Sequence, residues 1–273
     1  MSLKPKVTTS ASLQLIAPTQ ERPISLLSEL QPDAIVVAPH RHTEHAQLLV
    51  PAHGVIRVMS HTAIWIVPPT KAIVIPANFE HSMVAPSGTR LLAVNVHPSV
   101  FSDDLAGGCR VVHIGRLTSA LLDAIGADPR DYPLNSPASR KVDVLIDQLR
   151  LADAEPFRLP RPSDPRARGI ADGLVAEPGN PLTLSQWGKL FGASERTLAR
   201  IFETETGMGF REYRRQVQIH AAMGLLVAGM SIGDVAYDLG YESTSAFIFA
   251  FRTVTGSTPG RFRRAKVGKD ELL

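Results

Sequence analysis

Three histidines in the first third of the chain are spaced so that their side chains could form one chemical site. His40 and His42 are two residues apart, which places both imidazoles on the same side of an expected strand. A third imidazole, His81, and the amide of Gln47 follow further along the chain. Because imidazole suits several divalent transition metals, three imidazoles and an amide oxygen could bind Zn²⁺, Ni²⁺, Fe²⁺ or Mn²⁺.

The residues around these histidines resemble the two motifs of cupin barrels. The first motif, HxH-x4-E-x6-G, is matched by His40, His42, Gln47 and Gly54, with glutamine in place of the glutamate. The second motif, PxG-x2-H, is matched by Pro76, Asn78 and His81, with asparagine in place of the glycine. The resemblance implies one divalent ion inside a β-barrel, with these matching ligands: His40, His42, Gln47 and His81.

Other interpretations of the histidines stay open. Without a metal, the same barrel would hold a small effector in an apolar pocket, where the histidines hydrogen-bond the ligand or support the barrel. We expect His45, His53 and His61 to be surface or strand histidines. Glu44 could replace Gln47 as a ligand only with a different strand register.

A second informative pair, Arg196 and Arg200, lies in the last third of the chain. The two are one turn apart on an expected helix over 194–206, with Ser194 as its cap. Arginine is the commonest reader of guanine O6 and N7 in DNA, by a bidentate contact. The alternative is that both arginines contact only phosphates.

The arginines belong to a pattern that occurs twice, 49 positions apart. Each copy is a short apolar helix, a turn opened by a serine, and a second helix with apolar residues at i, i+3 and i+4, which is the layout of a helix-turn-helix. The repeated pairs are Ser194 and Ser243, Leu198 and Phe247, Ile201 and Ala250, Phe202 and Phe251, and Gly207 and Gly256.

An expected long helix over 210–228 separates the two copies. At ~1.5 Å per residue it measures ~28 Å, close to the ~34 Å between successive major grooves on one DNA face. The outward positions of the second copy are Thr244, Ser245, Ile248 and Phe249. We therefore expect the first copy to carry most direct readout, and the second to add shape and backbone contacts.

Residues 182–264 resemble the DNA-binding domain of the AraC/XylS transcription regulators. The matching stretches are SERTLARIFETETGM (194–208), SIGDVAYDLGYESTSAF (231–247) and FRTVTGSTPGRFR (251–263). The resemblance implies seven helices, two helix-turn-helix units and binding to promoter DNA. Family positions that face bases fall on Arg196, Ala199, Arg200, Thr244, Ser245 and Phe249. Members often have a polar or basic residue where this chain has Phe249.

Charge supports a DNA-binding C-terminal half. Residues 157–273 hold 16 Lys and Arg against 12 Asp and Glu, whereas residues 1–156 hold 13 against 14. Basic charge on one domain is typical of a protein that binds the phosphate backbone. Ser194, Arg252, Arg261 and Arg263 complete the expected DNA contacts, and Arg264, Lys266 and Lys269 add to the basic end.

The whole chain is expected to be an α+β protein of two domains. Short β-branched runs between turn residues predict a cupin-like barrel with trailing helices over 1–155, which senses an effector and could also dimerise. An amphipathic stripe at Val142, Leu145, Ile146 and Leu149 would pack against the barrel or form that dimer interface. Four prolines predict a linker over 156–166. An all-α domain with two helix-turn-helix motifs follows over 167–273.

Bulk properties restrict the class of protein. No run of eighteen apolar residues is present, no apolar leader follows Met1, and a single cysteine, Cys109, excludes an internal disulfide, so we expect a cytoplasmic protein. No Ser/His/Asp constellation, Walker loop or dinucleotide fingerprint is present either.

The leading hypothesis is therefore a non-enzymatic transcription regulator that binds promoter DNA. A small molecule or one divalent metal in the barrel would modulate it, with RNA polymerase and a second copy of the chain as further candidate partners. The alternatives are a metal-dependent cupin enzyme that carries a DNA-binding domain, and an architectural DNA binder without sequence preference.

Overall fold

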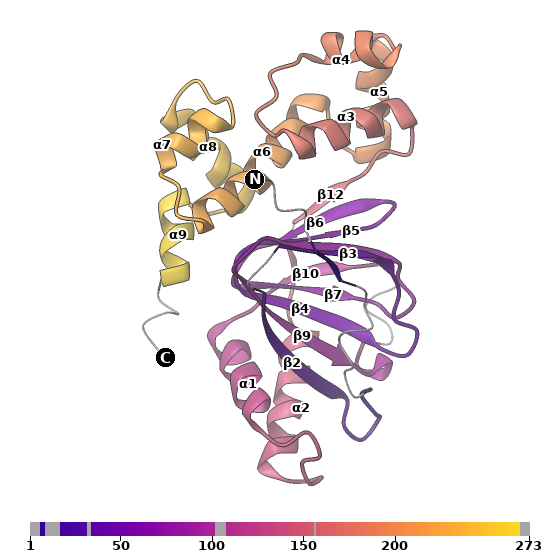
Figure 1. Ribbon diagram of the computed structural model, residues 1–273, viewed down its shortest axis with the longest axis vertical. Helices are drawn as coiled ribbons and strands as arrows, with labels where there is room; N and C mark the ends of the chain where they lie inside the picture. Colours follow the sequence, from indigo (N-terminus) through magenta and orange to yellow (C-terminus); the bar gives the residue numbers. More distant parts are fainter. Residues whose placement is uncertain (1–5, 9–16, 32–33, 102–107, 156, 268–273) are drawn as a thin grey trace. The chain divides into compact units, whose positions relative to one another are not determined.

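The structure is a computed structural model that describes residues 6–8, 17–31, 34–101, 108–155 and 157–267. The chain divides into two compact units. One runs to Arg158 without the segment His61–Ile64, and the other comprises that segment and the residues from Leu159 onwards. The N-terminal region is rich in sheet and the C-terminal region is helical, as the sequence predicted (Figure 1). The linker and domain bounds proposed above stay a prediction.

The strands form two six-stranded sheets. The first has the order β1-β3-β8-β5-β6-β12 and the second the order β11-β10-β7-β4-β9-β2. The strands are β1 (Lys6–Thr8), β2 (Ile24–Gln31), β3 (Ile35–His40), β4 (Ala46–His53), β5 (Ile56–Met59), β6 (Ala63–Val67), β7 (Lys71–Ile75), β8 (His81–Ala85), β9 (Thr89–Val96), β10 (Arg110–His113), β11 (Ala154–Glu155) and β12 (Arg158–Pro160).

The central strand β4 shows how the second sheet is buried on both faces. Ala46, Leu48 and Val50 belong to a core cluster that includes residues of two helices. Gln47 and Leu49 alternate with them and are also buried, so they lie on the opposite face of the sheet. A strand buried on both faces reads as a nearly continuous apolar run, which is why the sequence indicated it clearly.

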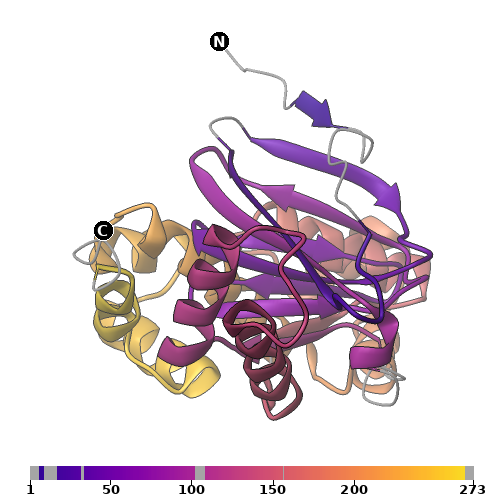
Figure 2. The ribbon, with the colours of Figure 1, turned by 90° about the horizontal axis from the view of Figure 1, so that it is seen from below.

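Two helices, α1 (Arg116–Ala127) and α2 (Pro137–Arg150), cover the first of these faces (Figures 1 and 2). Val142, Leu145, Ile146 and Leu149 are all buried in the same cluster as the strand residues. The amphipathic stripe therefore packs against its own sheet, which is the first of the two alternatives that the sequence left open. The spacing of Leu117, Leu121, Leu122 and Ile125 in the sequence indicates a loose apolar face on α1, but Leu117 is 53% exposed and does not belong to it.

The C-terminal unit consists of seven helices in the described residues. They are α3 (Pro165–Ala176), α4 (Leu184–Phe191), α5 (Glu195–Thr206), α6 (Phe210–Val227), α7 (Ile232–Asp238), α8 (Thr244–Thr255) and α9 (Pro259–Val267). None of the helices in the described part of the chain combines the length and the apolar character that crossing a bilayer requires.

The repeated residues mark the two ends of α5 and of α8 in the same way. Ser194 and Ser243 are the N-caps, and each hydroxyl accepts a hydrogen bond from the backbone N–H three residues later. Gly207 and Gly256 end the helices in the left-handed region, both with φ of 71°. The repeat in the sequence therefore marks two helices of equal length, each capped by a serine and ended by a glycine.

The apolar repeat positions form the buried face of each helix. Leu198, Ile201 and Phe202 are buried in α5, and their counterparts Phe247, Ala250 and Phe251 are buried in α8. In α4 the sequence places Leu184, Trp187, Leu190 and Phe191 on one side. The structure buries Leu184 and Trp187, but Leu190 is 67% exposed and does not lie with them.

Two glycine substitutions test the packing of this unit in opposite directions. A Cβ on Gly188 would lie 2.4 Å from the carbonyl oxygen of Ala193, so Gly188→Ala must displace the turn before α5. We expect a loss of about 1–3 kcal/mol, as for overpacking elsewhere. Gly224 in α6 has open space at its Cβ, so Gly224→Ala should gain about 0.5–1 kcal/mol through helix propensity. Urea unfolding followed by circular dichroism measures both, and equal effects of the two variants would contradict this packing.

The buried imidazole of His220 predicts a loss of stability in acid. His220 lies within α6 and is 4% exposed, and its burial lowers its pKa from 6.5 to about 4. Because the folded state resists protonation while the unfolded state accepts it, stability falls as the pH decreases from 6.5 towards 4. By pH 5 the wild type should lose about 2 kcal/mol more than His220→Gln, which does not titrate. The test is urea unfolding at pH 7.5 and pH 5, and parallel pH profiles would contradict it.

Candidate DNA interface and histidine cluster

The outward face of α5 carries the three positions expected to face bases. The helix starts after Ser194, whose hydroxyl accepts from the N–H of Thr197 at 3.1 Å. Since its apolar residues are buried, the opposite side is exposed, and Arg196, Ala199 and Arg200 all lie there. Two guanidinium groups one turn apart can reach neighbouring base pairs in a major groove.

The outward face of α8 has a different chemistry. Ser243 caps it by accepting from the N–H of Ala246 at 3.2 Å, and Thr244 and Ser245 are exposed in the first turn. Phe249 follows one turn after Ser245 and is 74% exposed. Arg252 lies in the next turn and is also exposed. The expected second-copy contacts are thus on one side of α8, around an apolar ring.

The basic end of the chain lies on α9. Arg261, Arg263 and Arg264 are all exposed in this helix. The side chain of Lys266 and the whole of Lys269 lie outside the described residues. The three arginines supply positive charge that a phosphate backbone would attract.

The long helix α6 holds both outward faces in one unit. The helices α5, α7 and α8 all contact it. Figure 1 shows α4 and α5 towards one end of α6 and α7 and α8 towards the other. Its 18 residues measure ~27 Å at ~1.5 Å each, near the ~34 Å between successive major grooves on one DNA face.

The segment before α3 is attached to the last turn of α5, which sequence reasoning missed. One carboxylate oxygen of Glu205 accepts hydrogen bonds from the N–H of Ser163 at 2.6 Å, its hydroxyl at 2.8 Å and the N–H of Asp164 at 3.0 Å. These bonds lower the pKa of Glu205, with the Asp164 N–H contributing most. Arg161 also donates two hydrogen bonds to Asp172 of α3. The end of the proline-rich segment is therefore fixed to the helical unit.

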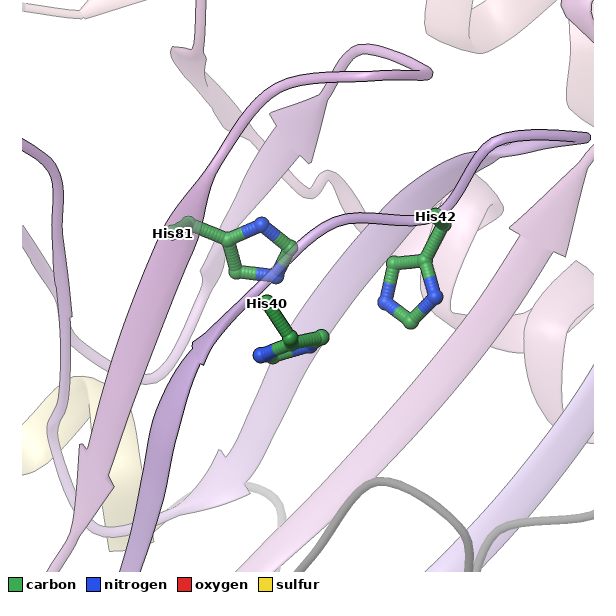
Figure 3. Close-up of side chains that lie close together, drawn as sticks. All are labelled: His40, His42 and His81. Carbon is green, nitrogen blue, oxygen red and sulfur yellow. The ribbon is translucent and has the colours of Figure 1, made fainter.

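In the N-terminal unit, His40, His42 and His81 lie close together (Figure 3). One ring nitrogen from each lies within 4.8 Å of the others. His40 ends β3 and His81 begins β8, and the two are directly paired across the strands. His42 lies in the loop after β3, so its expected place on the same strand as His40 was wrong. The grouping arises from the strand pairing and the loop that follows it.

Hydrogen bonds to the backbone orient two of the three rings. The Nδ1 of His40 lies 2.9 Å from the carbonyl oxygen of Ala38, and that of His81 lies 3.0 Å from the carbonyl oxygen of Phe79. A carbonyl accepts only from a protonated Nδ1, which leaves the lone pair on Nε2. The buried Nε2 atoms of His42 and His81 have no hydrogen-bond partner within the described residues. Metal-binding histidines commonly have this arrangement.

The cluster favours neutral imidazoles. Burial, followed by the charges of the neighbouring His45, His81 and His40, lowers the pKa of His42 from 6.5 to about 4. Burial is also the main cause that lowers the pKa of His81 to about 4. At neutral pH both rings are therefore uncharged and keep a lone pair for a metal or a hydrogen-bond donor.

Sequence reasoning missed a fourth ring and a polar row beside the cluster. The ring of His45 stacks on that of His42 at 4.7 Å and is half-buried, so it is not a surface histidine. Gln47 hydrogen-bonds to His42 and is paired with the buried Asn95 on β9, which is itself paired with the buried Ser25 on β2. The signal was available for two of them, since Gln47 interrupts the apolar start of β4 and Asn95 the apolar end of β9.

The carboxylates near the cluster are engaged elsewhere or exposed. Glu80 forms an ion pair with Arg41 at 3.0 Å, and Glu44 is exposed. Among the described residues, the group that could hold a metal consists of histidines alone. Gln47 keeps its predicted place beside them, where its hydrogen bond helps to orient His42.

Comparisons with known proteins place the chain among DNA-binding regulators. Residues 187–265 match a family model described as a helix-turn-helix domain. The chain is 33% identical over 230 residues to the HTH-type transcriptional regulator NimR of Escherichia coli (strain K12), covering 84% of this chain and 83% of the relative. It is 37% identical over 165 residues to the regulator RipA of Corynebacterium glutamicum, covering 60% and 47%.

Among solved structures, ToxT from Vibrio cholerae O395 is similar over 90% of this chain and 98% of its own, with 14% identity and a TM-score of 0.39. That score is too low to establish a shared fold. The relatives in sequence are named as transcriptional regulators, in agreement with the expectation of a protein that is not an enzyme. The chain belongs to the AraC/XylS family of helix-turn-helix transcription regulators.

Proposed function

We propose that this regulator reads promoter DNA with α5 and α8 in successive major grooves, and that an effector at the histidine cluster modulates this binding. The observation that carries the proposal is that α5 and α8 bury matching faces and expose matching faces. Each is capped by a serine, buries its repeated apolar residues and exposes the opposite face. In this proposal α4 with α5 and α7 with α8 are two helix-turn-helix units joined by α6, and the two sheets form the cupin-like barrel.

For the effector, we weighed a metal against the residues of the cluster. Two nitrogens that share one ion at ~2.1 Å lie no more than ~4.2 Å apart. The three ligand nitrogens lie within 4.8 Å of one another, so small ring rotations would bring them onto one ion. Three neutral imidazoles without a carboxylate favour Zn²⁺ or Ni²⁺ over Mn²⁺, which prefers oxygen ligands. Fe²⁺ is compatible as well.

A small organic effector is supported by the polar row beside the cluster. The Asn95 Oδ1 and the Ser25 Oγ are buried and have no hydrogen-bond partner among the described residues. Buried polar atoms normally have partners, so these atoms would suit a ligand that brings a hydroxyl or N–H group. Either effector would change DNA binding only by binding two states of the protein unequally.

Metal binding is tested with protein made without a histidine tag. We expect about one Zn²⁺ or Ni²⁺ per chain by elemental analysis, with a rise in melting temperature when the metal is added. His81→Gln should weaken metal binding by at least about a hundredfold, more than the loss of a residue that only supports a ligand. His53→Gln is the matched control, since His53 is outside the cluster. If the protein holds no stoichiometric metal and gains no stability from any added metal, the metal proposal fails and the organic effector is the remaining candidate.

The role of α5 is tested by Arg200→Ala in the full chain. If Arg200 reads guanine, the variant should lose about 1–3 kcal/mol of discrimination at one or two base positions of a selected operator. Arg263→Ala is the comparison, because a phosphate contact should weaken binding to all sequences alike and lower the salt dependence by about one charge. Selection from a random DNA library measures both. Unchanged base preference in Arg200→Ala would assign that arginine to the phosphates.

A further inference from the structure

An aromatic ring lies exposed where the first recognition helix has an arginine. Within the described residues of α5 and α8, Phe249 is the one large apolar side chain that is exposed, at 74%. It lies six residues after the cap Ser243, as Arg200 lies six residues after the cap Ser194. Exposure of a phenyl ring to water is unfavourable, so a partner that covers this ring would gain free energy from its burial.

The matching buried residues show that the two helices are seated in the same way. Leu198 and its counterpart Phe247 are both fully buried, and so are Phe202 and its counterpart Phe251. The outward row Arg196, Arg200 and Glu203 of α5 therefore corresponds to Ser245, Phe249 and Arg252 of α8. The ring of Phe249 occupies the place that a guanidinium occupies in the first copy.

The chemistry of the ring restricts what it can read. A phenyl group neither donates nor accepts hydrogen bonds, so it cannot recognise the polar edges of guanine, adenine or cytosine. Thymine alone presents an apolar group in the major groove, its C5 methyl, and phenylalanine can contact it. A ring packed on that methyl removes apolar surface of both from water.

The charges around the ring favour DNA as its partner over an apolar protein surface. The exposed Arg252 lies one turn beyond Phe249 on the same helix, and the exposed Arg261, Arg263 and Arg264 follow on α9. Ser245 offers a hydroxyl one turn before the ring. An apolar group with a hydroxyl one turn before it and a cation one turn after it matches a thymine methyl beside its phosphate backbone.

We propose that Phe249 determines specificity by packing on the C5 methyl of a thymine in the half-site read by α8. The operator is then bipartite, with a guanine-dependent half under α5 and a thymine-methyl-dependent half under α8. This inference rests on the proposed function, since it requires α8 to enter a major groove. It assigns direct readout to the helix for which the sequence predicted mainly shape and backbone contacts.

The experiment starts with an operator selected by the full chain from random DNA. Each thymine is then replaced singly by deoxyuridine, which removes only the methyl group. We expect about fourfold weaker binding at one thymine of the α8 half-site, the value for one methyl group returned to water. Phe249→Ala should weaken binding to the normal operator and abolish the difference between thymine and deoxyuridine at that site. Arg200→Ala should keep this difference.

A second variant tests the assignment by exchange. Phe249→Arg places the residue of the first copy in the second, and should move the preference at that position from thymine towards guanine. Because Phe249 is exposed, both variants should keep the wild-type melting temperature. Selection of no preferred sequence by the full chain would overturn the proposed function, and this inference with it. A selected operator in which no deoxyuridine weakens binding, or in which Phe249→Ala retains the deoxyuridine effect, would overturn the inference alone.

Discussion

The packing of α5 and α8 onto α6 is the constraint on which the helical unit depends. An amphipathic helix that buries one face fixes which residues face outward, and its caps fix where it begins. In α5 and α8 the buried residues and the caps occupy matching positions, with Ser194 and Ser243 at the starts. The same positions therefore face outward in α5 and α8, and the two helices differ in the side chains that these positions carry.

This separation of packing from readout explains how a duplicated element can acquire two specificities. The buried side chains maintain the helix position, so substitutions on the exposed face cost little stability. Arg200 and Phe249 illustrate the consequence, because one offers paired donors and the other an apolar ring at equivalent places. In the proposed function, two different half-sites read by a single chain would also remove the need for a palindromic operator, which a symmetric dimer would require.

Sequence patterns predicted the features that depend on local periodicity and failed where distant segments meet. The caps, the repeated glycines and the buried stripe of α2 follow from short spacings. The spacing of His40 and His42 indicated a cluster, although pairing of β3 with β8 and a loop create it. His45 and Asn95 were missed because the stacking of His45 on His42 and the pairing of Asn95 with Gln47 depend on the tertiary structure. The attachment of Glu205 to Ser163 likewise joins residues far apart in the chain.

In the proposed function, one chain places α5 and α8 in successive major grooves on the same DNA face. Hydroxyl-radical footprinting of the full chain on its selected operator tests this most directly. We predict two protected segments with centres about 10 base pairs apart on one face. Insertion of about half a helical turn between them should abolish simultaneous protection. A single protected segment, or two segments that survive that insertion, would show that α5 and α8 do not occupy successive grooves together.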